Sequence, residues 1–196
     1  MSNKKILVAR KTKETNLTLE FDILGSGETK LNTELPFFDH LLNSMAFHGN
    51  FNLKITGTGD IDVDPHHLVE DVGIVLGDAL KQTAQQYSPI TRFGHSVIPM
   101  DDALSEVTID VCGRPFCFYK ADYPQARSGS FDMSLLREFF NALAGKANIV
   151  IHAECRYGEN SHHMAESLFK ALGKAIKQAY QPLKEGSSVL STKGVI

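Results

Sequence analysis

A short motif, two adjacent histidines followed three residues later by a glutamate, occurs twice in this chain at an interval of 96 residues. The first copy is His66-His67-x-x-Glu70 and the second is His162-His163-x-x-Glu166. Similarity extends beyond the motif, because eight of the 17 aligned positions in 66–82 and 162–178 are identical. A period of about half the chain predicts two pseudo-symmetric units, since a solenoid needs shorter and more numerous repeats.

Each copy of the motif is predicted to open an amphipathic helix. His66 and Glu70 are four residues apart, so they share one face of a helix and can hold one metal ion together. His67 points elsewhere and serves a second ion or none. A histidine pair at a helix start can also be solvated surface, but the repetition of the whole pattern favours metal binding.

The first predicted unit covers residues 1–90 and has the order β-β-α-β-α. Alternation of apolar and polar residues in 16–24 is typical of a half-buried strand. Ser88-Pro89 ends the long helix and marks the boundary between the units. The remaining elements are strands at 5–10 and 51–55, helices at 36–48 and 66–87, and a glycine-rich turn at 56–60.

The second unit, residues 91–184, repeats this order. Its strands are predicted at 97–99, 105–112 and 148–154, with 116–119 as an extension of the sheet, and its helices at 133–144, capped by Asp132, and at 162–180. The fold class is therefore α+β, with two small mixed sheets and the helices packed between them. The Gly/Ser-rich tail, 185–196, is predicted to be disordered until something binds it.

Composition excludes several classes of function. The net charge of −3 and the absence of a basic block argue against a nucleic-acid partner. No apolar run reaches the roughly 18–20 residues that cross a membrane. The apolar run near the N-terminus is too short for the core of a signal peptide. The three cysteines, an odd number, suggest a reducing, cytoplasmic compartment.

Two further histidines are candidate metal ligands. His40 lies at a helix start, and either Asp39 or Asp64 is a candidate for orienting a bound imidazole. His152 lies in an apolar run, which favours a buried core histidine over a ligand. Six imidazoles and two glutamates would supply two ions with mixed nitrogen and oxygen ligands, which suits Mn, Fe, Co, Ni or Zn and disfavours Mg or Ca. The candidate metal ligands are His40, His66, His67, Glu70, His152, His162, His163 and Glu166.

A separate set of residues has the composition of a phosphate site. It consists of Arg92, Arg114, Lys170, Ser191 and Lys193. Arginine forks and a serine–lysine pair suit a phosphate dianion, although each residue alone is more typical of solvated surface charge. Lys170 is the strongest member, because it lies four residues after Glu166 on the same face of its helix.

Taken together, the motifs resemble imidazoleglycerol-phosphate dehydratase of histidine biosynthesis over nearly the whole chain. They are Phe37-Phe38-Asp39-His40, Asp64-x-His66-His67-x-x-Glu70-Asp71, Arg92-Phe93-Gly94, Pro99-Met100-Asp101, Gly113-Arg114-Pro115, Gly158-x-Asn160-x-His162-His163-x-x-Glu166, Phe169-Lys170-Ala171 and Ser191-Thr192-Lys193-Gly194. The chain departs from the family pattern at Ser44, Pro65, Asp102 and Cys112. None of these departures removes a candidate ligand, and Ser44 is the one that affects substrate contacts.

The resemblance implies a duplicated fold like the second domain of ribosomal protein S5. It implies dehydration of D-erythro-imidazole-glycerol phosphate to imidazole-acetol phosphate through a metal-bound imidazolate or diazafulvene-like intermediate. It also implies two manganese ions per site and a twenty-four-subunit cage built from trimers, with active sites between subunits. Glu14 is then the candidate that moves the proton and contacts substrate, with Glu70 or Glu166 as the alternative, and Lys193 closes the tail over the phosphate.

Two other functions use the same residues. A dinuclear-metal phosphoesterase would use the ions to generate hydroxide. A non-catalytic assembly protein would use the histidines to join subunits through metal, but it would not need the phosphate-like residues. A homo-oligomer with a small phosphate-bearing substrate is the interpretation that uses every motif.

Overall fold

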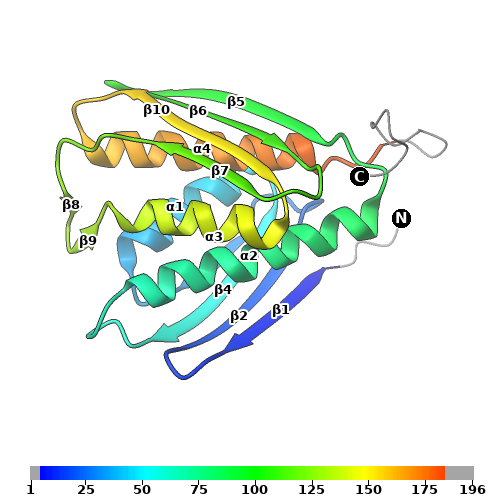
Figure 1. The fold of residues 1–196 in the computed structure, drawn as a ribbon, viewed down its shortest axis with the longest axis horizontal. Helices are drawn as coiled ribbons and strands as arrows, with labels where there is room; N and C mark the ends of the chain where they lie inside the picture. Colours follow the sequence, from blue (N-terminus) through cyan, green and yellow to red (C-terminus); the bar gives the residue numbers. More distant parts are fainter. Residues whose placement is uncertain (1–4, 184–196) are drawn as a thin grey trace.

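The computed structural model of the protein describes residues 5–183, in which two four-stranded sheets enclose four helices (Figure 1). The first sheet contains, in order, β1 (Ile6–Lys11), β2 (Thr15–Asp22), β4 (Asn52–Gly59) and β3 (Thr29–Asn32). The second contains β5 (Phe93–Met100), β6 (Ala103–Asp110), β10 (Val150–Tyr157) and β7 (Phe116–Lys120). The helices are α1 (Pro36–Gly49), α2 (His66–Tyr87), α3 (Leu135–Ala147) and α4 (Ser161–Ala179). A short hairpin of β8 (Arg127–Ser128) and β9 (Phe131–Asp132) precedes α3.

The two sheets have the same topology. In each, three strands pair antiparallel and the fourth, β3 or β7, pairs parallel to its neighbour. This confirms the predicted α+β class with two mixed sheets and helices between them. The division of the chain at residue 90 stays a prediction.

Three details of the predicted elements are corrected by the structure. Strand β3, Thr29–Asn32, was not expected, because four residues at a sheet edge carry too little alternation. Residues 56–59 belong to β4 and not to a turn, and Gly57 leaves the space that Leu17 and Leu68 fill. Helix α3 begins at Leu135, while the Asp132 carboxylate caps the preceding turn by accepting from the amide and hydroxyl of Ser134.

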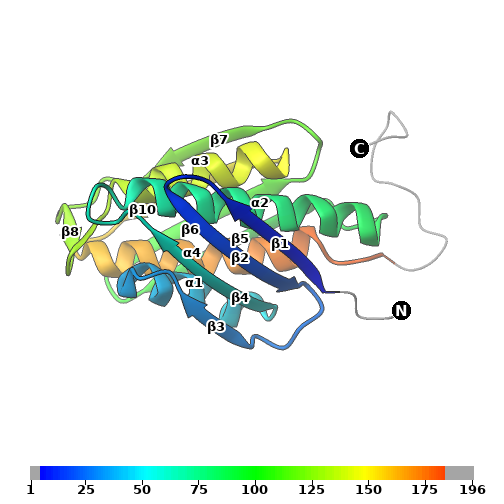
Figure 2. The ribbon, with the colours of Figure 1, turned by 90° about the horizontal axis from the view of Figure 1, so that it is seen from below.

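The helices join the two sheets into one core. Helix α2 packs on β1 and β2, and α4 packs on β5 and β6. The shorter helices pack across the two halves of the chain. Helix α1 of the first half packs against α4 of the second, and α3 of the second half packs against α2 of the first. Figure 2 shows the first sheet lying across this helical layer. None of the helices within residues 5–183 is long and apolar enough to cross a membrane.

A pair of repeated glycines allows this close helix packing. A Cβ on Gly173 of α4 would lie 2.0 Å from the carbonyl oxygen of Met45 in α1. A Cβ on Gly77 of α2 would lie 2.8 Å from the carbonyl oxygen of Leu143 in α3. Both contacts involve backbone, so neither neighbour can move aside by changing a rotamer. The repeat therefore preserves glycine where one helix backbone approaches the other.

Gly173→Ala is expected to lower the free energy of unfolding by at least about 2 kcal/mol, since overpacking a core typically costs 1–3 kcal/mol and here the clash is with backbone. Gly145→Ala is the matched control, because nothing lies within 4 Å of a Cβ at that exposed helical position. That control should be neutral or stabilising by up to about 1 kcal/mol. Chemical denaturation measures both, and equal stability of the two variants would contradict the packing argument.

Candidate metal centre

Both histidine motifs occupy the first turn of a long helix, and the two helices start at the same end of the molecule (Figure 1). Each start is fixed by a side chain two residues before the first histidine. The Asp64 carboxylate accepts from the amide of His66, and the Asn160 side-chain oxygen accepts from the amide of His162, both at 2.9 Å. The repeat thus places two equivalent turns that present histidine and glutamate side chains.

The second motif forms a compact cluster with His40 from α1. The Glu166 Oε2 atom lies 3.1 Å from His40 Nε2 and 3.2 Å from His162 Nε2. Ligand atoms of His40, His162 and Glu166 all lie within 4.8 Å of one another. Two imidazole nitrogens and one carboxylate oxygen form a donor set that suits a first-row transition metal.

Glu166 is buried and held by two further groups. Its Oε1 accepts from the Ser44 hydroxyl and from the Lys170 ammonium, each at 3.0 Å. Burial alone would raise the pKa of Glu166, but the hydrogen bonds from Lys170, His40 and Ser44 outweigh it and lower the pKa to about 2. The carboxylate is therefore ionised at neutral pH, as a metal ligand must be.

The first motif is more open. His66 Nε2 lies 3.7 Å from Glu70 Oε2, and 47 % of the Glu70 side chain is exposed. Across residues 5–183, the only group of three or more candidate ligands that comes together is the one around Glu166. One chain therefore does not bring the two motifs into one cluster.

The second histidine of each motif is oriented by an aspartate. The Nδ1–H of His67 donates to Asp60 at 3.0 Å, and the Nδ1–H of His163 donates to Asp102 at 2.5 Å. This hydrogen bond to the Asp60 carboxylate raises the pKa of His67. A proton fixed on Nδ1 leaves Nε2 of each ring as the atom available for a metal.

The expectation that Asp39 or Asp64 orients an imidazole was wrong. The Asp39 carboxylate accepts from the amide and hydroxyl of Thr33, and Asp64 accepts from the backbone of His66. Both carboxylates stabilise backbone turns at the start of a helix, where their short side chains reach amides first. Asp102 also accepts from the amides of Glu159 and Asn160, so it fixes the loop that leads into α4.

Glu14 lies in the turn between β1 and β2, beside the first motif. Its carbonyl oxygen accepts from the amide of Asp60 at 3.1 Å, and its carboxylate charge contributes to the raised pKa of His67. The side chain is exposed. The structure therefore places the candidate proton-transfer residue next to candidate ligands.

His152 lies elsewhere. It is exposed on the outer face of the second sheet, between the rings of Phe116 and Phe118 at centroid distances of 5.8 and 5.6 Å. The expectation of a buried histidine was wrong, because the alternation of β10 directs this residue away from the core while Ile151 and Ala153 point inward. Within one chain it does not join the Glu166 cluster.

The candidate phosphate residues are divided between two regions. Lys170 lies at the Glu166 cluster. Burial, followed by the charges of Lys170 and Lys174, lowers the pKa of His48. Arg92 pairs with Asp110 at 2.7 Å, and its amide donates to Ala179 at the far end of α4, about 20 Å along the helix from Glu166 at 1.5 Å per residue. Arg114 is exposed in a loop at that same end. Ser191 and Lys193 lie outside the described residues.

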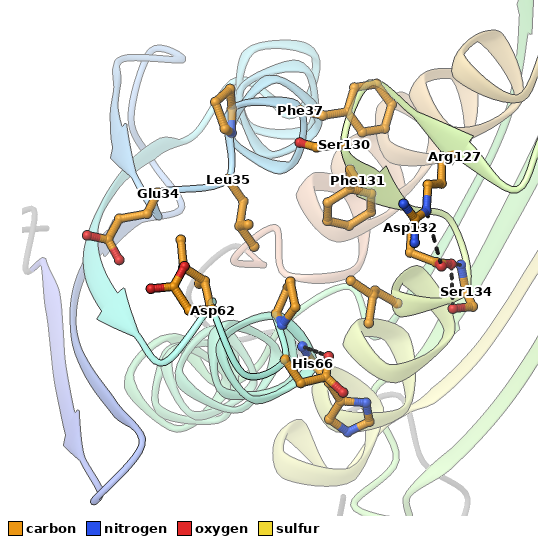
Figure 3. Close-up of a pocket in the computed structure, with 15 residues that line it drawn as sticks. Glu34, Leu35, Phe37, Asp62, His66, Arg127, Ser130, Phe131, Asp132 and Ser134 are labelled. Carbon is orange, nitrogen blue, oxygen red and sulfur yellow. Dashed lines mark hydrogen bonds and ion pairs between the residues drawn. The ribbon is translucent and has the colours of Figure 1, made fainter.

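A cavity of about 590 Å³ lies beside the first motif (Figure 3). His66 lines it on one side. Phe37 lines it on the other and packs against the His162 ring with a centroid distance of 5.1 Å. Its polar lining includes Glu34, Asp62, Asp64, Asp132, Arg127 and His66. The cavity thus borders the start of α2 and comes within one side chain, Phe37, of His162.

Comparison with known proteins identifies the family. The family model described as imidazoleglycerol-phosphate dehydratase matches residues 33–176, which include His40, both histidine motifs and Lys170. The chain belongs to the imidazoleglycerol-phosphate dehydratase family. The dehydratase of Geobacter sulfurreducens is 45 % identical over 192 residues, covering 98 % of each chain, and that of Acetivibrio thermocellus is 43 % identical over 194 residues, covering 99 % of this chain and all of the other.

Solved dehydratase structures share the fold. The enzyme of Pyrococcus furiosus is 36 % identical, with a TM-score of 0.83 over 96 % of this chain and all of the other. The enzyme of Staphylococcus aureus is 30 % identical, with a TM-score of 0.80 over 91 % of this chain and all of the other. Membership confirms the resemblance seen in the sequence and the expected class of enzyme, a hydro-lyase.

The sequence did not point to every residue that contacts the candidate ligands. Ser44 and Asp102 were noted only as departures from the family pattern, and Asp60 was not noted at all. The contacts of Ser44 with Glu166 and of Asp102 with His163 join elements that are distant in the chain, whereas Asp60 lies seven residues before His67. A hydroxyl on the buried face of α1 is the one signal that marks Ser44, because a buried hydroxyl needs a partner.

Proposed function

We propose that this chain removes water from D-erythro-imidazole-glycerol phosphate to give imidazole-acetol phosphate, using two manganese ions per active site. The observation that carries the proposal is the cluster of His40, His162 and Glu166 in a member of the dehydratase family. Family membership favours this reaction over a phosphoesterase and over a non-catalytic metal-joined assembly. The small-molecule phosphate is the partner, and the cytoplasm is the proposed compartment.

The residues of the chain fit two ions. One ion would be held by His40, His162 and Glu166, whose ligand atoms are already together. The other would use His66 and Glu70, with Nε2 of His67 and His163 offered to ions shared with another copy. The mixed nitrogen and oxygen donors are compatible with manganese. His152 stays a predicted ligand that only a neighbouring copy would bring to an ion.

The reaction expels the hydroxyl from the carbon that carries the imidazole ring and removes the proton from the next carbon. That carbon keeps its own hydroxyl, so the product is an enol, which becomes the ketone. Divalent ions held by these residues would supply Lewis-acid stabilisation of the negative charge that develops on the imidazole ring as the hydroxyl leaves. Glu14 takes the proton in our proposal, since its carboxylate lies beside His67 and is exposed to an approaching substrate. Glu70 or Glu166 is the alternative.

Lys170 would hold the substrate phosphate near the Glu166 cluster. Arg92 and Arg114 lie at the opposite end of α4, so we propose that they complete the site of another copy. The tail residues Ser191 and Lys193 are proposed to close over the phosphate. Because these groups are apart in one chain, we propose a homo-oligomer with active sites between subunits, a twenty-four-subunit cage built from trimers.

The proposed function predicts the product of a simple assay. Metal-free protein supplied with Mn²⁺ and imidazole-glycerol phosphate is expected to form a ketone without releasing inorganic phosphate. Carbonyl derivatisation measures the ketone, and a phosphate assay runs on the same samples. Release of inorganic phosphate would favour the phosphoesterase, and absence of turnover with bound metal would favour a role in assembly alone.

His67→Ala is expected to weaken assembly as well as turnover, because His67 offers Nε2 away from the Glu166 cluster of its own chain. The measurement is native mass by light scattering, together with kcat. His95→Ala is the matched control, since His95 pairs only with Glu106 on the exposed face of the second sheet. If His67→Ala keeps both the native mass and the turnover of the unmodified protein, the ligand assignment fails.

A further inference from the structure

We propose that Ser44 is a positioning residue that restricts Glu166 to one metal-binding oxygen. The proposal rests on the proposed function, because it concerns how the chain receives one of the two ions. It assigns a role to a residue at which the chain departs from the family pattern. Its basis is that the two oxygens of the buried Glu166 carboxylate have different partners.

The two oxygens of Glu166 have different surroundings. Oε1 accepts from the Ser44 hydroxyl and the Lys170 ammonium, each at 3.0 Å. Oε2 faces Nε2 of His40 at 3.1 Å and Nε2 of His162 at 3.2 Å. Two hydrogen-bond donors thus occupy one oxygen, while the other oxygen lies with two nitrogens that are ligand atoms themselves. An ion among these three atoms would meet one oxygen of Glu166.

Ser44 and Lys170 do not act in the same way. The Lys170 ammonium holds the carboxylate but also repels a divalent cation, so its removal would change orientation and charge together. The Ser44 hydroxyl is neutral, and the residue is 6 % exposed. Removing it alters the position of Glu166 without altering the charge of the site. Substitution of Ser44 therefore tests the effect of the position of Glu166 separately from the charge of the site.

The first motif has no counterpart of this arrangement. Lys170 corresponds to Ile74 in the repeat, and the paired contacts of Gly173 with Met45 and of Gly77 with Leu143 make Ala142 the counterpart of Ser44. Neither Ile74 nor Ala142 has a side chain that donates a hydrogen bond. The Glu70 side chain is 47 % exposed, whereas Glu166 is buried. Loss of the Ser44 hydroxyl is therefore expected to affect only one of the two ions.

The test is a calorimetric titration of metal-free, full-length protein with Mn²⁺. In Ser44→Ala, one class of site is expected to weaken about tenfold, the range found when a residue that orients a ligand is removed, and the other class to stay unchanged. Ser44→Thr retains the hydroxyl and should restore both affinities. Thermal unfolding of each metal-free variant, recorded in parallel, separates a loss of fold from a loss of binding.

Ser167→Ala is the matched control. Ser167 is a fully buried serine next to Glu166, but its hydroxyl bonds to Ser105 and to the carbonyl of Met164. Equal Mn²⁺ affinities in Ser44→Ala and Ser167→Ala, or equal weakening of both classes of site, would overturn the positioning role. If the unmodified protein binds no Mn²⁺, the metal part of the proposed function falls and this inference falls with it. If Mn²⁺ binds and depends on Ser44 but no ketone forms, the positioning role holds and the proposed reaction is wrong.

Discussion

Glu166→Gln is expected to lower kcat by at least about 10³-fold, since a metal-assisted step draws several kcal/mol from its ion and each 1.36 kcal/mol is a factor of ten. The carboxylate is the one charged ligand of the cluster, and its Oε2 lies between two imidazole nitrogens. An amide of the same shape keeps the packing but is a poor ligand. Loss of one Mn²⁺ per chain should accompany the loss of turnover, measured by metal analysis after gel filtration.

Glu154→Gln is the control for this variant. Glu154 lies on β10 and pairs with Lys120 at 2.8 Å, so the same substitution there removes only a surface ion pair. Its turnover and metal content should match those of the unmodified protein. If Glu166→Gln retains both ions and most of its turnover, the cluster around Glu166 is not the catalytic metal site.

Glu14→Gln should lower kcat by about 10²–10⁴-fold, the usual contribution of a positioned general acid or base, and leave Mn²⁺ binding unchanged. After the hydrogen bond to Asp60, the charge of Glu14 contributes to the raised pKa of His67, and Glu14 is not among the clustered candidate ligands His40, His162 and Glu166. Steady-state kinetics and the Mn²⁺ titration are the two measurements. A loss of turnover without a loss of Mn²⁺ binding distinguishes a proton-transfer residue from a metal ligand.

Glu28→Gln provides the comparison for Glu14, because Glu28 is also exposed and lies in a loop of the same half of the chain. It should behave as the unmodified protein. Should Glu14→Gln lose bound Mn²⁺ in proportion to its activity, Glu14 is a ligand and Glu70 becomes the candidate for proton transfer.

Much of the fold could be predicted because the repeat constrains it. The internal repeat predicted both long helices and the motif at which each of them begins, and Pro89 predicted the end of α2. Strand β3 could not be predicted, since its pairing with β4 depends on a neighbour more than 20 residues away. Gly57 suggested a turn, but its role is to admit Leu17 and Leu68, a packing reason that only the tertiary structure contains.

The sequence predicted the types of residue in the candidate site better than it predicted which residue each of them contacts. His162 and Glu166 were placed together correctly, because their spacing on a helix fixes it. The pairing of His163 with Asp102 spans 61 residues, and that of Glu166 with Ser44 spans 122. No local pattern encodes such pairings. Arg92 and Lys170 were grouped by chemistry alone, and the structure places them at different ends of α4.

The central claim is that the repeated motifs hold two ions, one of them bound by His40, His162 and Glu166. A crystal of the protein grown with Mn²⁺ and measured at the manganese absorption edge tests it most directly. The account predicts two anomalous peaks per chain, one of them bounded by Nε2 of His40, Nε2 of His162 and a single oxygen of Glu166. A single peak per chain, or two peaks that both lie away from Glu166, would contradict it.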